Sequence, residues 1–544
     1  MHVSRRASLM TATLLLILPV TCAVAQEVPH IENHDGRFAM VVDGKPFFML
    51  GAQINNSSSW ASTLPDVWPA LRDLHVNTVE APVYWEQMEP QQGKFDFSNV
   101  DLLITGAREQ HMHLTLLWFG TWKNGQNHYV PEWVKTDPTQ YRREVNAYGK
   151  LLDVMSPNSD ANMEADKRAF AALMRHVREI DSEQHTVILV QVENESGSVG
   201  AVRDFSSAAQ KEFAAPVPGI LTEALHTEPG TWSQVFRADA DEVFAAYSTA
   251  HYINEVAKAG KAEYPLPMYC NVWITYPVHA LENRKHPSAG QEYPSGGAQQ
   301  QNIAIWKAIA PSIDVLAPDF YSEDATLFHQ IVATYHRSDN PLFIPETGLS
   351  KKFGDYFFYA LGNGAIGFSP FGVDYTGWTL ENHKIPGWLS EDYALFEPMQ
   401  QEIAQLNLKG KLQTNVEEPG MQRQTIHFED VEAVVSYGFP QHDGEVPPGT
   451  ADGHGRVMVA EIAALEFLVT GVDASVTFQL NSDYGKTHNE QLEIVRAEQG
   501  HYESGVWKVE RIWNGDQTDR GLNFKGGQGA VVRIRLHRLP LMIQ

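Results

Sequence analysis

Between residue 40 and about residue 410, eight short apolar segments alternate with amphipathic helical segments. The apolar segments are rich in Val, Ile, Leu and Phe, without strict polar alternation, which is typical of strands buried on both faces. In chain order they are residues 46–53, 76–85, 113–119, 186–192, 266–272, 313–318, 342–345 and 365–369. Eight such strands separated by helices predict an α/β fold, the (β/α)8 or TIM barrel.

A doubly wound open sheet is the alternative arrangement of the same elements. Such sheets commonly bind nucleotides through a glycine-rich turn after a strand. Neither GxGxxG nor GxxxxGK[ST] follows any of the eight segments, which favours the closed barrel.

The pattern changes after about residue 412, where helical spacing fades and short alternating segments appear. These segments are residues 432–437, 456–461, 466–470, 475–480 and 530–536, separated by clusters of Gly, Asp, Asn and Pro. This pattern is typical of a β-sandwich. We therefore predict a barrel over residues 26–411 and a C-terminal β-sandwich over residues 412–544.

The first 25 residues have the features of a secretory signal peptide. Arg5 and Arg6 precede an apolar run at residues 9–20, and the small residues 23–25 (Ala-Val-Ala) suit signal peptidase. A membrane anchor is the alternative. No later run of about 20 apolar residues predicts a span, so we expect a secreted or periplasmic protein without membrane insertion in its mature form.

Charge and short motifs exclude several classes of function. The chain has 41 Lys and Arg against 67 Asp and Glu, a formal net charge of −26, which disfavours nucleic acid and anionic membranes as partners. The 22 histidines form no HExxH motif, and no GxSxG motif is present. We expect neither a catalytic metal nor a cofactor.

Two glutamates end predicted strands on which a barrel would carry its active site. Glu195 follows the fourth strand and Glu346 the seventh, and barrel active sites lie at the carboxyl ends of strands. Cleavage of a glycosidic bond needs two carboxyl groups flanking one sugar carbon. A single such glutamate is more often a structural acid, but two at these ends favour chemistry. We expect Glu193 to be a supporting, ion-paired residue.

Two motifs resemble glycoside hydrolase family 35, the β-galactosidases: QVENESGS at residues 191–198 and VYWEQMEPQQGKFDF at residues 83–97. The resemblance implies that Glu195 is the acid/base and Glu346 the nucleophile, with Asn194 donating to the sugar 2-hydroxyl. It implies an exo-acting retaining enzyme that removes terminal β-galactose from an oligosaccharide.

The chain also departs from the family pattern. Pro82 stands where many members have Tyr, and Tyr84 is the candidate replacement; residues 117–120 (Leu-Trp-Phe-Gly) lack the usual strand-three glutamate. These departures fit a divergent bacterial branch, some of whose members remove galactose from xyloglucan side chains. A β-glucosidase, a family 42-like enzyme and a non-catalytic sugar-binding barrel remain alternatives.

Aromatic residues near the predicted strand ends are candidates for stacking against sugar rings. Trp118, Trp273 and Tyr321 are the main ones, with Tyr321 expected to contact the nucleophile. Trp122, Trp133, Tyr276, Tyr375 and Trp378 are further rim candidates. The sandwich could pack against the barrel, complete the site, bind polymer or mediate formation of a homodimer.

Overall fold

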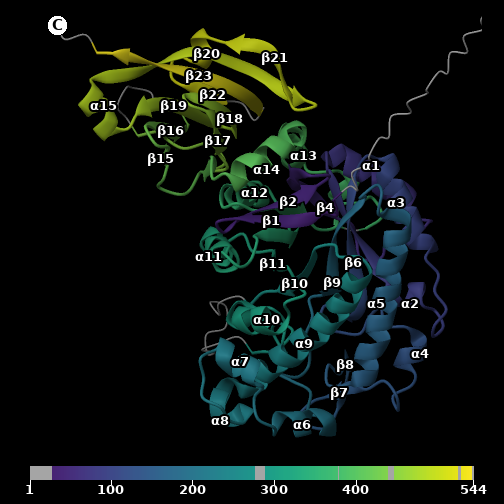
Figure 1. Cartoon of the computed structure of the whole chain (residues 1–544). Helices are drawn as coiled ribbons and strands as arrows, with labels where there is room; N and C mark the ends of the chain where they lie inside the picture. Colours follow the sequence, from purple (N-terminus) through teal and green to yellow (C-terminus); the bar gives the residue numbers. More distant parts are fainter. Residues whose placement is uncertain (1–26, 276–287, 378, 439–445, 525–528, 542–544) are drawn as a thin grey trace, which may run out of the picture.

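A closed barrel of eight parallel strands forms the body of the protein (Figure 1). The computed structural model describes residues 27–275, 288–377, 379–438, 446–524 and 529–541, so the predicted signal peptide, Tyr276 and Trp378 lie outside the described residues. In order around the barrel, the strands are β4 (Met49–Gln53), β5 (Thr78–Tyr84), β6 (His113–Lys123), β9 (Val187–Asn194), β10 (Met268–Trp273), β11 (Val315–Phe320), β12 (Phe343–Thr347) and β13 (Gly367–Pro370). The predicted (β/α)8 barrel is confirmed.

Helices cover the outside of the barrel between successive strands. The main ones are α1 (Leu64–Leu74), α3 (Ser98–Glu109), α5 (Asp160–Asp181), α9 (Ala240–Glu263), α10 (Ile303–Ile309), α11 (Ala325–Tyr335), α12 (Lys352–Gly362), α13 (Gly387–Phe396) and α14 (Gln400–Leu408). Side chains on each strand alternate between two cores. On β6, Leu116 and Trp118 pack with the helices, whereas Leu117 and Phe119 fill the barrel interior.

A small N-terminal sheet closes the barrel at the end where its strands begin. It consists of β1 (His30–His34), β2 (Arg37–Val42) and β3 (Lys45–Phe47). Met40, Val42 and Phe47 join the interior core together with Met49, the first residue of β4. The carboxyl ends of the strands, at the opposite end of the barrel, are left for the connecting loops.

Loops at the carboxyl ends carry short extra elements. These are α2 (Trp85–Met88), α4 (Glu132–Lys135), β7 (Arg143–Val145), β8 (Leu151–Met155), α6 (Ser207–Phe213), α7 (Gly219–Ala224) and α8 (Trp232–Phe236). Among the helices that the structure describes, none is both long and apolar enough to cross a bilayer.

Two antiparallel sheets form the C-terminal region beside α12–α14 (Figure 1). The larger contains β14 (Leu412–Val416), β17 (Arg456–Ala463), β18 (Glu466–Val472), β20 (Glu490–Glu503), β21 (Val506–Trp513) and β23 (Ala530–Pro540). The smaller contains β15 (Arg423–His427), β16 (Val431–Tyr437), β19 (Ala474–Leu480) and β22 (Leu522–Phe524), and α15 (Ser482–His488) follows β19. The predicted sandwich is confirmed, although the pattern missed five of its strands, β14, β15, β20, β21 and β22. β20 and β21 were missed because their sequences are largely polar and exposed.

The larger sheet is buried on both faces along β17. Val457 and Val459 pack into the sandwich core, while Met458 and Ala460 join the barrel core. β14 also lies against α12. The sandwich is thus packed onto the barrel through an apolar interface, which explains why residues 456–461 read as a nearly continuous apolar run.

Candidate active site

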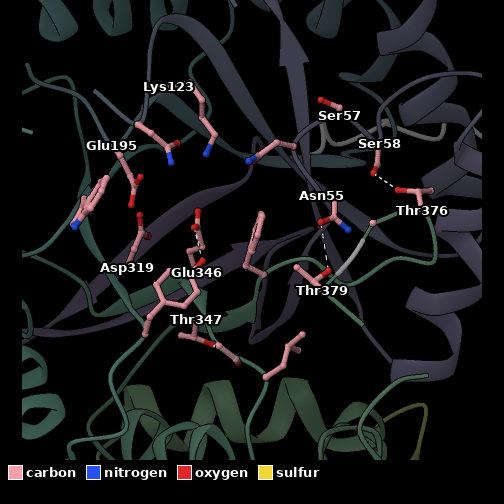
Figure 2. Close-up of a pocket in the computed structure, with 18 of the residues that line it drawn as sticks. Asn55, Ser57, Ser58, Lys123, Glu195, Asp319, Glu346, Thr347, Thr376 and Thr379 are labelled. Carbon is pink, nitrogen blue, oxygen red and sulfur yellow. Dashed lines mark hydrogen bonds between the residues drawn. The ribbon is translucent and has the colours of Figure 1, made fainter. Parts of the chain in front are cut away.

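A cavity of about 990 Å³ opens where the barrel strands end (Figure 2). It receives side chains from the ends of β6, β9, β10, β11 and β12 and from the loops after β4 and β13. The charged and aromatic residues that line it include Lys123, Glu195, Trp273, Asp319, Tyr321 and Glu346. Both glutamates singled out in the sequence are therefore brought into one cavity.

Glu195 lies directly after β9 in an unusual backbone conformation. Its φ is 43°, a left-handed value uncommon for residues other than glycine. Its backbone N–H donates to Asn271 Oδ1 at 3.0 Å, which holds this turn against β10. Backbone strain of this kind often occurs at functional sites, where the surrounding structure maintains it.

Glu346 is contributed by β12 and is 6% exposed. The Tyr321 hydroxyl donates to Glu346 Oε1 at 2.5 Å, as the sequence predicted for Tyr321. The other oxygen, Oε2, is buried without a hydrogen-bond partner among the described residues. One carboxylate oxygen is thus held in place while the other is free to approach a substrate.

Asp319 is a third carboxyl group in the cavity. One oxygen each of Glu195, Asp319 and Glu346 lie within 4.8 Å of one another. Asn271 Nδ2 donates to Asp319 Oδ2 at 2.7 Å, so the same Asn271 side chain bonds both Asp319 and the backbone of Glu195. Asp319 Oδ1 has no hydrogen-bond partner in the described part of the chain. The carboxyl groups of Asp319 and Glu195 point toward one another (Figure 2).

Burial and crowding of like charges favour protonation in this cluster. Burial, and next the charge of Glu346, raise the pKa of Glu195 to about 7, while Lys123 opposes the rise. Burial, followed by the charges of Glu346 and Glu195, raises the pKa of Asp319 well above its ordinary range. Near neutral pH the cluster therefore retains protons, which a general acid requires.

Three neighbouring carboxylates could offer oxygen ligands to a divalent cation. In this structure, however, Glu346 Oε1 accepts from Tyr321 and Asp319 Oδ2 accepts from Asn271. The expectation that catalysis needs no metal stays a prediction.

Lys123 is a site residue that the sequence did not reveal. β6 runs four residues beyond the predicted strand, which brings Lys123 to the rim of the cavity with only 4% of its surface exposed. Its Nζ donates to Asn194 Oδ1 at 2.8 Å. Asn194 Nδ2 is buried without a partner among the described residues, so Lys123 fixes the amide with its donor group available.

Not all predicted sugar contacts reach the cavity. Tyr321 and Trp273 line it, and they are 44% and 38% exposed. Trp118 instead points outward, where its indole Nε1 donates to Asp166 of α5 at 2.9 Å. Tyr84 is buried and accepts from the backbone N–H of Ser59. Neither Trp118 nor Tyr84 lines the cavity, because strand parity and the packing of β5 direct them elsewhere.

Glu193 forms no ion pair with any residue that the structure describes, contrary to our expectation. Its Oε2 accepts from the backbone N–H of Trp122 at 2.6 Å. Burial, followed by the charge of Asp166, raises the pKa of Glu193 well above its ordinary range. Glu193 is thus a buried carboxyl group on the helix side of β9 whose surroundings favour protonation, whereas Glu195 faces the cavity.

Small polar side chains line the wall formed by the loops after β4 and β13. Ser58 and Thr376 share a hydrogen bond at 2.5 Å, and Thr379 donates to Asn55 at 3.4 Å (Figure 2). All four residues line the cavity. The polar run at residues 55–59 was the sequence signal for this wall, since it directly follows the first strand.

The chain is similar to known glycosidases. Residues 39–296 match the family model described as Glycosyl hydrolases family 35, and residues 389–525 match Domain of unknown function (DUF5597). A β-galactosidase of Xanthomonas manihotis is 29% identical over 193 residues, covering 34% of this chain and 29% of that protein. Beta-galactosidase 11 of Arabidopsis thaliana is 27% identical over 187 residues, covering 31% and 19%.

Solved structures with a similar fold include a β-galactosidase from the psychrophilic Marinomonas ef1. Its TM-score is 0.47 at 12% identity, covering 66% of this chain and 61% of that chain. The chain spans less than a third of the length of the two curated relatives named above. The family match includes Glu195 and both motifs that suggested the resemblance. Residues 39–296 of this chain are thus similar to glycosyl hydrolase family 35.

Proposed function

We propose that this protein is a retaining exo-β-galactosidase that removes terminal β-galactose from oligosaccharides. The observation that carries the proposal is the cavity in which Glu195 and Glu346 present carboxyl oxygens within 4.8 Å of each other. Retaining glycosidases hold their two carboxyl groups about 5–5.5 Å apart, whereas inverting enzymes need about 6.5–9.5 Å to admit a water. The family match and the names of the relatives support galactose as the sugar.

The first step is attack by Glu346 on the anomeric carbon. As the carboxylate oxygen forms its bond, the bond from that carbon to the glycosidic oxygen breaks, and Glu195 transfers its proton to the departing oxygen. The raised pKa of Glu195, about 7, suits a group that must hold a proton near neutral pH. Tyr321 keeps the attacking carboxylate of Glu346 oriented.

The second step releases the sugar. Glu195, now ionised, takes a proton from water while the water oxygen bonds to the anomeric carbon and the ester bond to Glu346 breaks. Two inversions at the same carbon restore the starting configuration. The free Nδ2 of Asn194 is available to bond the sugar 2-hydroxyl through both steps.

We propose further that the enzyme is exported and acts on plant-type oligosaccharides, with xyloglucan side chains as a candidate substrate. The signal-like sequence of residues 1–25 supports export to the periplasm or the medium. The xyloglucan proposal rests on the resemblance to a divergent bacterial branch of the family. Sequencing the N-terminus of the exported protein would test cleavage of the signal peptide. Sedimentation of the full chain would test whether it forms a homodimer.

The decisive experiment compares nitrophenyl β-galactoside with the matching β-glucoside, β-xyloside and α-arabinoside. We expect a β-galactoside preference and, by NMR, the β-anomer as the first product. Glu346→Gln should lower kcat by at least about a thousandfold on every galactoside, because it removes the nucleophile. Glu195→Gln should be milder on nitrophenyl galactoside, whose leaving group needs little protonation, than on methyl β-galactoside.

Glu228→Gln is the matched control, because Glu228 is exposed and lies outside the cavity. A preference for another glycoside would be consistent with the proposed mechanism but would contradict galactose as the proposed sugar. An α-anomer as first product, or full activity in Glu346→Gln, would contradict the proposed mechanism. Binding of galactose without hydrolysis of any substrate would favour a sugar-binding barrel.

A further inference from the structure

A second, smaller cavity of about 260 Å³ adjoins the catalytic cavity. The two cavities share Asn124 and Trp273 as lining residues. The other described residues that line the smaller cavity are Gln126, His128, Val199, Gln291, Glu292 and Tyr293. Trp273 stands between the two spaces with 38% of its surface exposed, so one side chain can contact groups in both.

The wall of the side cavity is built directly onto the backbone of Glu195. Residues 123–126 form a tight turn closed by hydrogen bonds between Lys123 and Gln126. At its tip, the N–H of Gly125 donates to the carbonyl of Glu195 at 3.0 Å, and that of Asn124 donates to the carbonyl of Asn194 at 3.2 Å. The side cavity therefore lies on the Glu195 side of the site.

This turn depends on glycine at its tip. Asn124 and Gly125 both have positive φ, 54° and 68°, as a two-residue type I′ turn requires. A Cβ on Gly125 would lie 2.6 Å from Val199 Cγ2, so a larger residue would push this wall apart. The turn therefore packs closely against Val199, which lines the side cavity.

The direction of the proposed reaction gives the side cavity a role. Glu195 protonates the oxygen that leaves with the aglycone, so the aglycone must occupy the Glu195 side. Sugar rings have apolar C–H faces that pack on aromatic rings and hydroxyls that bond to amides. Trp273 supplies an exposed ring, while Asn124, Gln126 and Gln291 supply amide groups.

We propose that the side cavity binds the aglycone of the substrate, and that this aglycone is a neutral sugar residue stacked on Trp273. The inference rests on the proposed function and extends it by naming the class of leaving group. Its volume of about 260 Å³ is just below the usual range for drug-sized ligands, about 300–1,000 Å³, and suits a single sugar ring.

The charges in the side cavity favour a neutral ring over an anionic one. Glu292 is the acidic residue of its lining, and no lysine or arginine occurs among the described residues that line it. Burial, followed by the charges of Lys135 and Lys123, lowers the pKa of His128, so its imidazole is uncharged near neutral pH. The cavity thus offers hydrogen bonds without a cation to match a uronate or sulfate.

The test compares two galactosides that differ only in their aglycone: methyl β-galactoside and a neutral β-galactosyl disaccharide. We expect Trp273→Ala to lower kcat/KM for the disaccharide by about tenfold more than for methyl β-galactoside, since one lost pocket contact costs about 10–200-fold. Gln126→Ala should show a smaller loss with the same selectivity. Trp273→Phe, which keeps a ring, should recover most disaccharide activity.

Tyr148→Ala is the control, since Tyr148 is a 96% exposed aromatic residue outside both cavities. Equal losses on both substrates in Trp273→Ala, with Trp273→Phe no better, would overturn the assignment of the side cavity while leaving the β-galactosidase proposal intact. A wild-type chain inactive on both galactosides would instead contradict the proposed function, and the aglycone assignment with it.

Discussion

The catalytic cavity and the contact between barrel and sandwich both bury carboxylates, but these carboxylates differ in their charged and hydrogen-bonded partners. In the cavity, Glu195, Asp319 and Glu346 lie together with Lys123 as the cation that lines it. At the contact, Arg456 of β17 and Asp392 of α13 form a bidentate pair in which each side chain is at most 2% exposed.

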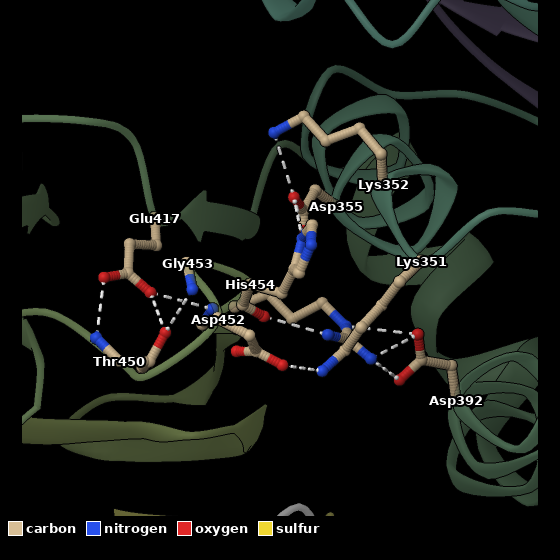
Figure 3. Close-up of polar contacts among 11 residues, drawn as sticks. Lys351, Lys352, Asp355, Asp392, Glu417, Thr450, Asp452, Gly453 and His454 are labelled. Carbon is tan, nitrogen blue, oxygen red and sulfur yellow. Dashed lines mark hydrogen bonds and ion pairs between the residues drawn. The ribbon is translucent and has the colours of Figure 1, made fainter.

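The interface pair is fully bonded. Arg456 Nη2 donates to Asp392 Oδ1 at 2.7 Å and to Oδ2 at 2.8 Å, and Arg456 Nη1 donates to the carbonyl of His454 at 2.9 Å. Burial still raises the pKa of Asp392 to about 6, although Arg456 opposes this rise. Nearby, Asp355 bonds both Lys352 and His454 (Figure 3).

The difference separates a structural use of buried charge from a catalytic one. Both oxygens of Asp392 have partners, so this pair holds two parts of the chain in register. In the cavity, Glu346 Oε2, Asp319 Oδ1 and Asn194 Nδ2 are buried without partners among the described residues. Unbonded buried groups cost stability, and a substrate that supplies the missing bonds recovers that cost.

Removing one member of the interface pair should give the largest effect. Arg456→Met leaves Asp392 buried and unpaired, and we expect a loss of about 3–5 kcal/mol in the free energy of unfolding, measured by urea denaturation. The double variant Arg456→Met with Asp392→Leu should recover much of the loss. A single variant as stable as the wild type would show that the interface does not depend on this pair.

Replacing the cavity residue Glu195 should have the opposite effect and raise the free energy of unfolding at high pH. The pKa of Glu195 is about 7 in the folded chain against an ordinary 4.5, so its contribution to stability is fully present below pH 4.5 and lost as pH rises to about 7. Replacement by Gln should gain about 3 kcal/mol at pH 8 relative to pH 4. Equal urea midpoint shifts at both pH values would contradict the raised pKa.

Asp319 should affect rate and pH dependence together. In the wild type, we expect kcat/KM to fall about tenfold per pH unit above about pH 7, as Glu195 loses its proton. The neighbouring side chain of Asp319 lowers the pKa of Glu195, so Asp319→Ala should move this limb to higher pH. The same variant should lower kcat/KM by about tenfold to a hundredfold.

Asp319→Asn keeps a hydrogen-bond donor and should retain more activity than Asp319→Ala. Both variants could instead lose the same activity while the alkaline limb of the kcat/KM pH profile stays at the wild-type pH. That result would show that Asp319 serves only to hold Asn271 in place.

The smallest effect is expected at the exposed edge of the interface. Gly348 and Leu349 line the cavity, and the same loop continues to Lys351, which forms an ion pair with Asp452 of the sandwich (Figure 3). The side chains of this pair are 38% and 46% exposed, so Lys351→Ala should cost less than about 1 kcal/mol by urea denaturation. A loss of several kcal/mol would instead show that this exposed ion pair contributes as much to stability as the buried Arg456–Asp392 pair.

Much of the barrel and part of its site could be predicted because local patterns carry them. Strand periodicity indicated eight buried strands, and strand ends located Glu195 and Glu346. The same reasoning failed for Trp118, since a one-residue change of parity turns a strand side chain from cavity to core. It missed Lys123 because β6 continues past its apolar run through a Gly-Thr segment.

The sequence by itself determined the two kinds of architecture and the two catalytic candidates, because burial period and motif order are local properties of a chain. Only the tertiary structure decided which polar groups meet. The contact of Asp319 with Glu195, the orientation of Asn194 by Lys123, and the Arg456–Asp392 pair each join separate elements. Such contacts depend on how the barrel closes and how the sandwich docks, which no spacing within one segment encodes.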